Sequence, residues 1–156
     1  MKQGVLNSKE LLEHWQGHRK LTRRVIELFP EKELFSFSIG GMRPFSEMAA
    51  ELLSIAVPAL REIVDNTVGK YEEGKNPLQT KEQILQYWDE ATPLIDELFM
   101  QISPERFEEE HNLFGEYKFP IIHNVFYFID NEIHHRAQGY VYLRALGIEP
   151  PFFWDR

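Results

Sequence analysis

The chain has no cysteine among its 156 residues, which excludes disulfides, thiolate nucleophiles and cysteine-ligated zinc. Histidine and the carboxylates are the strong metal ligands that remain. No apolar run reaches the roughly 18 residues that a membrane-spanning helix needs. The first twelve residues also lack the basic start and apolar stretch of a secretory signal. We therefore expect a cytoplasmic protein with no membrane partner.

Positive charge is also scarce. Lysine and arginine number 17 against 25 acidic residues, which gives a formal net charge of −8. Because nucleic-acid binding needs a basic face that releases counterions from phosphate, we expect no nucleic-acid partner. The hydrophobic share of 43% and the charged share of 27% are those of ordinary globular proteins. The length suits one domain that spans residues 1–156.

Four segments show the three- and four-residue spacing of apolar side chains that predicts amphipathic helices. The fourth is bounded by Pro120 and Gly147, residues typical of a helix start and stop. The connections at residues 31–43 and 103–118 are predicted to be irregular, and no strand is expected. The aromatic tail, residues 148–154, is expected to pack back on the helices. The sequence thus predicts an all-α, antiparallel four-helix bundle, with helices near residues 8–29, 44–63, 80–102 and 120–147.

The last predicted helix carries a seam of polar residues along an otherwise apolar surface. Asn131 and His135 stand four apart, Tyr127 precedes them by one turn, and Gln138 and Tyr142 continue the same side. Buried polar groups without partners cost a few kcal/mol each. The seam therefore requires a hydrogen-bond network or a bound ligand, and the sequence leaves both open.

Glu51 lies among apolar residues of the second predicted helix, at the edge of its buried stripe. A buried carboxylate pairs with arginine, histidine or a metal, or takes up a proton. The simpler alternative is that Glu51 reaches solvent, or pairs with Arg43 or Arg136.

Two further patterns resemble metal sites. His14 and His18 are four apart on one helix face, but we favour ordinary, partly buried histidines there. Glu132 and His135 form the Glu-x-x-His pattern of di-iron bundles, with only a poor second copy at residues 108–111, so no di-iron site is expected. Ser/His/Asp machinery, a phosphate-binding glycine loop and a dinucleotide fingerprint are absent.

The segment from Asn131 to Gln138 reads Asn-Glu-Ile-His-His-Arg-Ala-Gln, and Leu-Arg-Ala-Leu-Gly follows, ending at Gly147. It resembles the C-terminal helix of the DinB/YfiT-like superfamily, which often reads His-x-x-His-His-Arg-Gly-Gln before Leu-Arg-x-Leu-Gly. Residues 42–48, Met-Arg-Pro-Phe-Ser-Glu-Met, resemble that family's approach to a histidine on its second helix. The resemblance covers essentially the whole chain and implies a DinB/YfiT-like bundle.

In that family a divalent metal, often zinc or nickel, sits on three histidines between the second and fourth helices. Carried over by position, the metal site becomes Glu51, Asn131 and His135. An asparagine amide is a poor zinc ligand. A direct Glu51 to His135 hydrogen bond, oriented by Asn131, would satisfy the same groups without metal. The resemblance also implies that the cofactor and substrate pocket is lined by Tyr127, Gln138 and Tyr142.

Some members of the family transfer groups to a low-molecular-weight thiol. The resemblance therefore implies a divalent-metal-dependent small-molecule enzyme, with thiol-dependent S-transfer as one reaction. The alternative is a degenerate relative that has lost catalysis and acts as a small-molecule binder or a dimeric interaction protein. Homodimers are common among relatives, so a homodimer is expected. The sequence does not decide whether the protein is an enzyme.

Overall fold

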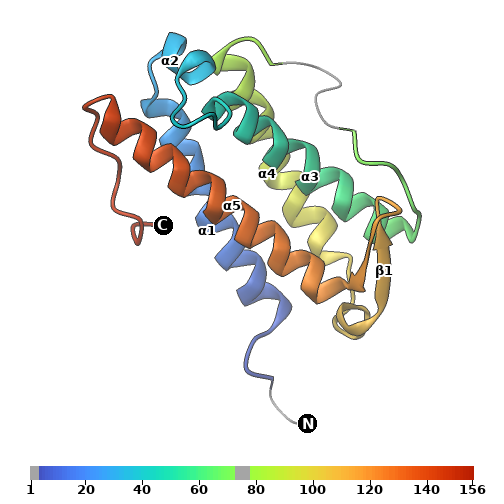
Figure 1. Ribbon diagram of the computed structural model, residues 1–156. Helices are drawn as coiled ribbons and strands as arrows, with labels where there is room; N and C mark the ends of the chain where they lie inside the picture. Colours follow the sequence, from blue (N-terminus) through green and yellow to red (C-terminus); the bar gives the residue numbers. More distant parts are fainter. Residues whose placement is uncertain (1–3, 73–77) are drawn as a thin grey trace.

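The computed structural model describes residues 4–72 and 78–156 (Figure 1). Helices dominate these residues, and the four long ones, α1, α3, α4 and α5, occupy the four predicted segments. The all-α bundle predicted from the sequence is confirmed. The elements in chain order are α1 (Ser8–Leu28), α2 (Glu31–Ser36), α3 (Phe45–Asp65), α4 (Lys81–Met100), the 3-10 turn η1 (Pro104–Glu108), β1 (Glu110–Leu113), β2 (Tyr117–Pro120) and α5 (Ile121–Ala145).

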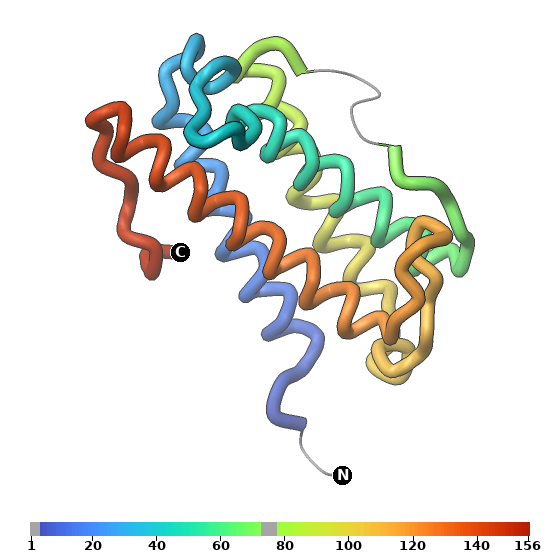
Figure 2. The backbone as a smooth tube through the Cα atoms, in the orientation of Figure 1, coloured from blue at the N-terminus to red at the C-terminus, as the bar shows by residue number. Residues whose placement is uncertain are grey.

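The long helices form a four-cornered bundle in which two run in each direction. Figures 1 and 2 show α1 and α5 pointing one way and α3 and α4 the other. Each long helix packs mainly on two neighbours: α1 and α3 both contact α4 and α5. As a result, α3 and α5, which carry the predicted site residues, are antiparallel neighbours.

Helix ends follow the capping signals of the sequence. Asn7 and Glu10 form a capping box in which each side chain accepts a backbone N–H of the other, at 2.9 and 3.0 Å. Thr80 Oγ1 likewise accepts from the backbone N–H of Gln83 at 3.1 Å. Beyond α5, Gly147 adopts a φ of 75°, the left-handed conformation in which glycine commonly follows a helix.

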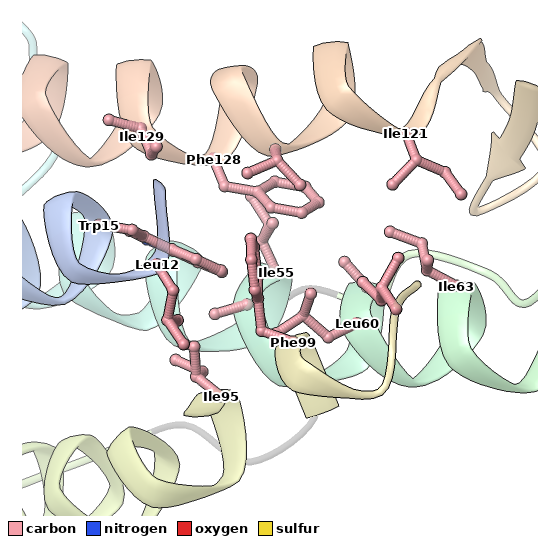
Figure 3. Close-up of a cluster of buried hydrophobic side chains, with 14 of the residues drawn as sticks. Leu12, Trp15, Ile55, Leu60, Ile63, Ile95, Phe99, Ile121, Phe128 and Ile129 are labelled. Atoms are coloured by element: carbon pink, nitrogen blue, oxygen red, sulfur yellow. The ribbon is translucent and has the colours of Figure 1, made fainter. Parts of the chain in front are cut away.

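The core consists of two groups of buried side chains along the bundle. In the first, Trp15 packs against Phe99 and Phe128, with ring centroids 6.3 and 5.6 Å apart (Figure 3). In the second, Phe29 of the α1 end stacks on Phe45 at 4.9 Å. Burial of such large rings supplies much of the hydrophobic stabilisation of a bundle.

A β-hairpin occupies the connection that was predicted to be irregular and solvated. Strands β1 and β2 pair antiparallel, with Glu110 opposite Pro120. His111 and Leu113 are buried and alternate with more accessible neighbours, which is the period-two pattern of a strand. Phe114 at the turn is buried as well, with a φ of 56°. The prediction of no strand is wrong because this alternation is only four residues long and begins at the last of three consecutive glutamates.

Two smaller predictions are also corrected. Residues 31–36 form the helix α2 rather than irregular chain. The tail contacts α1 through Arg24 Nη1, which donates to the Asp155 carbonyl at 2.9 Å, but its aromatic side chains do not pack on the bundle. Phe152, Phe153 and Trp154 are 62%, 64% and 63% exposed. The charged, turn-rich residues 69–76 also predict a surface loop, and residues 73–76 of it lie outside the described residues.

No helix in the described part of the chain is long and apolar enough to cross a membrane.

Candidate functional site

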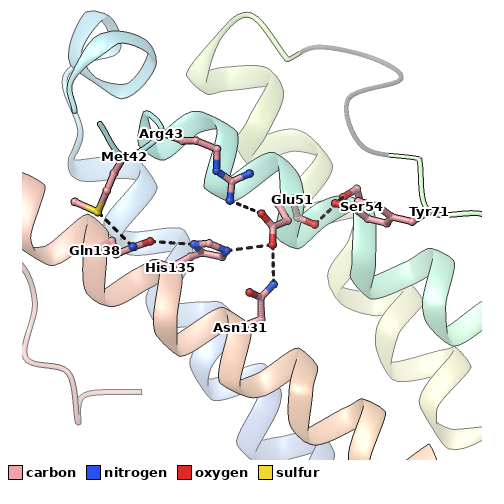
Figure 4. Close-up of polar contacts among 8 residues, drawn as sticks. All are labelled: Met42, Arg43, Glu51, Ser54, Tyr71, Asn131, His135 and Gln138. Carbon is pink, nitrogen blue, oxygen red and sulfur yellow. Dashed lines mark hydrogen bonds and ion pairs between the residues drawn. The ribbon is translucent and has the colours of Figure 1, made fainter. Parts of the chain in front are cut away.

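Glu51 on α3 faces Asn131 and His135 on α5 (Figure 4). His135 Nε2 lies 3.2 Å from Glu51 Oε1, and Asn131 Nδ2 donates to the same oxygen at 3.2 Å. Arg43, just before α3, donates to the other oxygen, Oε2. The structure thus brings together the three residues that the resemblance implied as metal ligands. It also supplies the arginine partner that was the simpler expectation for Glu51.

Helix geometry explains why these groups meet. Asn131 and His135 are four residues apart, so both project from one side of α5. Gly139, one turn further along, permits close packing of α5 on α3. A Cβ atom added there would lie 2.6 Å from a ring carbon of Phe45 on α3. The approach of the two helices is therefore set by a residue that has no side chain.

A second layer of contacts holds His135 and Arg43. His135 Nδ1 lies 3.0 Å from Gln138 Oε1, and the Gln138 amide nitrogen donates to Met42 Sδ at 3.4 Å. Both nitrogens of the His135 ring therefore face side-chain oxygen atoms, which fixes the orientation of the ring. Tyr142, fully buried, donates its hydroxyl hydrogen to the Arg43 carbonyl at 2.9 Å. Gln138 and Tyr142 thus help to position His135 and Arg43, the two partners of Glu51.

The contacts on Glu51 keep it ionised. The hydrogen bond from His135, together with those from Arg43 and Asn131, lowers the pKa of Glu51 to about 2, although partial burial acts in the opposite direction. At neutral pH the carboxylate is therefore negative and is matched by the positive guanidinium of Arg43.

A cavity of about 440 Å³ opens beside Glu51. Its walls come from α3, the chain after α3, the β-hairpin and the start of α5, and they are mainly apolar or aromatic. Of the predicted site residues, Glu51 and Tyr127 line it, and Tyr127 has a pKa raised by burial and by the nearby Glu51 charge. The lining residues are Glu51, Ile55, Tyr71, Leu113, Phe114, Tyr117, Phe119, His123, Asn124 and Tyr127.

The sequence reasoning missed Asn124 and the aromatic residues of the hairpin. Asn124 stands seven residues before Asn131, two helix turns away on the same side of α5. The polar seam therefore begins one turn earlier than predicted, and the seven-residue spacing would have identified it. The hairpin residues were missed because two strands of four residues each are too short to be identified from alternation in the sequence.

The residues at this site do not fit a zinc or nickel ion. Within residues 4–72 and 78–156, no three histidine or carboxylate side chains are placed to hold a metal together. Asn131 directs its amide nitrogen, which cannot ligate, toward Glu51. Arg43 adds a permanent positive charge at Glu51, which opposes a second cation. One imidazole and one carboxylate, already engaged with each other, are a poor donor set for these metals.

The other metal-like patterns do not assemble either. His18 is buried, and its Nδ1 lies 2.9 Å from an Arg136 nitrogen. Its Nε2 is 3.2 Å from that of His14. Arg136 also donates to the His18 carbonyl at 3.0 Å, so it turns toward α1 and away from Glu51. Glu132 is buried within electrostatic reach of Arg19 and Arg136, and the ring nitrogens of His135 face Glu51 and Gln138.

Comparisons with known proteins agree with this architecture. The model of the DinB family matches residues 111–154, which run from β1 through α5 into the tail. A crystal structure of a DinB-like protein from Bacillus cereus ATCC 10987 superposes with a TM-score of 0.75, at 15% identity over 97% of this chain and 99% of that one. This chain therefore has a DinB-like fold, and its C-terminal part matches the DinB family model. The predicted resemblance is confirmed.

A DinB-like protein from Bacillus subtilis gives the same result. Its crystal structure superposes with a TM-score of 0.73, at 19% identity over 94% of this chain and 99% of that one. At such low identity these DinB-like structures establish the fold and nothing about ligands. No curated protein sequence matches the chain.

Proposed function

We propose that this DinB-like protein binds a small molecule in the cavity beside Glu51 and does so without a divalent metal. The observation that carries the proposal is the pairing of Glu51. One carboxylate oxygen contacts Asn131 and His135, and the other contacts Arg43. These contacts satisfy the Glu51 carboxylate within the protein, which is the alternative to metal binding that the sequence left open.

The cavity suits a binding function. Small-molecule sites are typically concave, largely apolar and in the range of about 300–1,000 Å³, with a few polar groups that orient the ligand. The cavity here has a volume of about 440 Å³ and places Glu51 and Tyr127 among apolar and aromatic walls. In this proposal the Glu51 cluster links α3 to α5 beside the cavity, so that the cavity keeps its shape when it is empty.

Metal analysis separates this proposal from the metal-dependent enzyme. Untagged wild-type protein and the His135→Ala variant are analysed by elemental mass spectrometry, before and after incubation with zinc or nickel. We expect neither protein to hold a stoichiometric metal. Near-stoichiometric metal in the wild type that is lost in His135→Ala would overturn the proposal. Assays of transfer to a low-molecular-weight thiol would then follow.

A reconstructed site provides the positive control. The double substitution Glu51→His with Asn131→His, combined with the native His135, places three imidazoles where the structure has one. Because three histidines are a strong zinc donor set, this variant should take up zinc. Zinc in the reconstructed protein and none in the wild type would show that the donor set, and not the assay, accounts for the difference.

Ligand binding itself is tested with tetralin, an uncharged two-ring hydrocarbon, followed by amide chemical shifts in NMR. Shifts should concentrate on residues that line the cavity. Ile55→Phe narrows the cavity and should weaken binding, whereas Ile133→Phe, at a partly exposed position of α5, should leave it unchanged. Equal effects of the two substitutions would show that tetralin binds elsewhere.

A further inference from the structure

We infer that the ligand of this cavity is an uncharged, largely aromatic or alicyclic molecule that carries a carbonyl group, and that Asn124 recognises the carbonyl oxygen. The inference rests on the proposed function, because it specifies the ligand of the same cavity. Three properties of the lining residues support it: the aromatic walls, the balance of charge, and one amide without a partner.

The walls favour a flat, apolar ligand. Rings of Tyr71, Phe114, Tyr117 and Tyr127 reach the cavity from the chain after α3, from the hairpin and from α5. Aromatic rings prefer offset-stacked or edge-to-face contacts with other rings. The volume of about 440 Å³ gives room for a molecule of two fused rings.

The charges favour a neutral ligand. Glu51 is the acidic residue among the described lining residues, and Arg43 and His135 already engage its carboxylate. No lysine or arginine is among the described residues of the lining. A charged ligand would lose its hydration in the cavity and would find no lysine, arginine or unpaired carboxylate among the described lining residues.

The amide of Asn124 defines the polar group of the ligand. Asn124 lines the cavity and is only 3% exposed. Its Nδ2 has no hydrogen-bond partner among the described residues. A buried donor without an acceptor is destabilising, so a ligand that brings an acceptor gains affinity by relieving this. Rotation of the carboxamide about its Cβ–Cγ bond turns this nitrogen toward the cavity, where an acceptor on the ligand can meet it.

The test compares two ligands that differ at one position. 1-Tetralone carries a carbonyl where tetralin carries a methylene group, and their shapes are otherwise closely similar. Both are titrated into the full-length wild type and into Asn124→Leu by NMR. We expect Asn124→Leu to weaken 1-tetralone binding about tenfold, the scale of one hydrogen bond, and to leave tetralin binding unchanged or slightly tighter. The comparison cancels the different hydration of the two free ligands.

Thermal unfolding by circular dichroism controls for folding. Because the substitution removes an amide nitrogen that has no partner in the described part of the chain and puts an apolar group in its place, Asn124→Leu should unfold at the wild-type temperature or above it. If this variant fails to fold, Asn124→Ala replaces it, since alanine also lacks the donor and adds no bulk.

The outcomes distinguish ligand binding in the cavity from recognition of the carbonyl by Asn124. If neither ligand binds the wild type, the proposed small-molecule function fails and the inference fails with it. If both bind, but substitution of Asn124 changes their affinities by the same factor, the cavity binds ligands and only the carbonyl recognition is overturned. A selective loss of 1-tetralone supports the inference.

Discussion

The close packing of α3 on α5 depends on Gly139, and Gly139→Ala tests this. Alanine in a helix interior normally stabilises by about 1 kcal/mol relative to glycine. Here the new Cβ atom would lie 2.6 to 3.0 Å from three ring carbons of Phe45. Phe45 is fully buried and stacked on Phe29, so its ring has no free space to move into. Overpacking of this kind costs about 1–3 kcal/mol.

Gly17 offers a matched control in α1. A Cβ atom there would meet only the Arg156 Cβ, at 3.4 Å, which is an ordinary contact. Gly17→Ala should therefore gain the full helix term of about 1 kcal/mol. Because this term is common to both substitutions, the difference between them isolates the clash. We expect Gly139→Ala to be less stable than Gly17→Ala by about 1–3 kcal/mol.

Urea unfolding followed by circular dichroism measures the free energy of unfolding of both variants. In thermal scans their midpoint temperatures should differ by about 2–4 °C per kcal/mol. Phe45→Leu combined with Gly139→Ala should recover part of the loss, because the smaller side chain makes room for the new methyl group. Equal stabilisation by Gly139→Ala and Gly17→Ala would refute the idea that glycine sets the helix spacing.

Two further outcomes follow from buried groups. Burial, together with nearby Arg136, lowers the pKa of His18 to about 3. As the pH falls, the unfolded chain therefore binds a proton at His18 at a higher pH than the folded protein does. The free energy of unfolding should consequently decrease between about pH 6.5 and pH 3. The free energy of unfolding should change by up to about 1.4 kcal/mol per pH unit for one proton. His18→Gln should reduce this slope when urea unfolding is measured across the range. An unchanged slope would count against His18 as the titrating group. Glu62 Oε1 accepts the Phe114 backbone N–H at 3.0 Å and so ties the hairpin to α3. Glu62→Leu should speed hydrogen exchange in the hairpin and destabilise the protein by about 1–3 kcal/mol, whereas Glu62→Gln keeps an acceptor and should do less; equal effects would rule out this role for the bond.

The facing of Glu51 and His135 was implied by the family resemblance, whereas the alignment of Asn131 with His135 could be predicted from helical periodicity, which is a local property. Residues four apart share one side of a helix wherever the helix lies. The apolar stripes on each segment then determine which sides meet, and the buried seam follows. The capping residues at Asn7 and Thr80 likewise act within one turn of chain, so the helix starts were predictable.

The cavity was not predictable on the same grounds. Its hairpin wall consists of two four-residue strands, which are too short for a clear alternation and are bordered by glutamates. Their burial depends on packing against α3, through contacts such as that of Glu62 with Phe114, which are remote in sequence. The preference of Glu51 for Arg43 over Arg136 also depends on tertiary structure, because Arg136 turns toward α1.

The nature of residue 51 connects these observations. The resemblance placed a neutral histidine ligand at this position, and the chain has a carboxylate there instead. Replacing a neutral ligand with an anion leaves a buried negative charge that requires a partner. A divalent metal would meet that requirement, but so does Arg43, which belongs to the same chain and needs no binding step. Because a guanidinium has neither vacant coordination positions nor exchangeable ligands, it can orient and neutralise Glu51 but cannot activate a bound water or thiol. The positive charge of Arg43 beside Glu51 thus favours a preformed ligand-binding site over a site for metal-assisted chemistry.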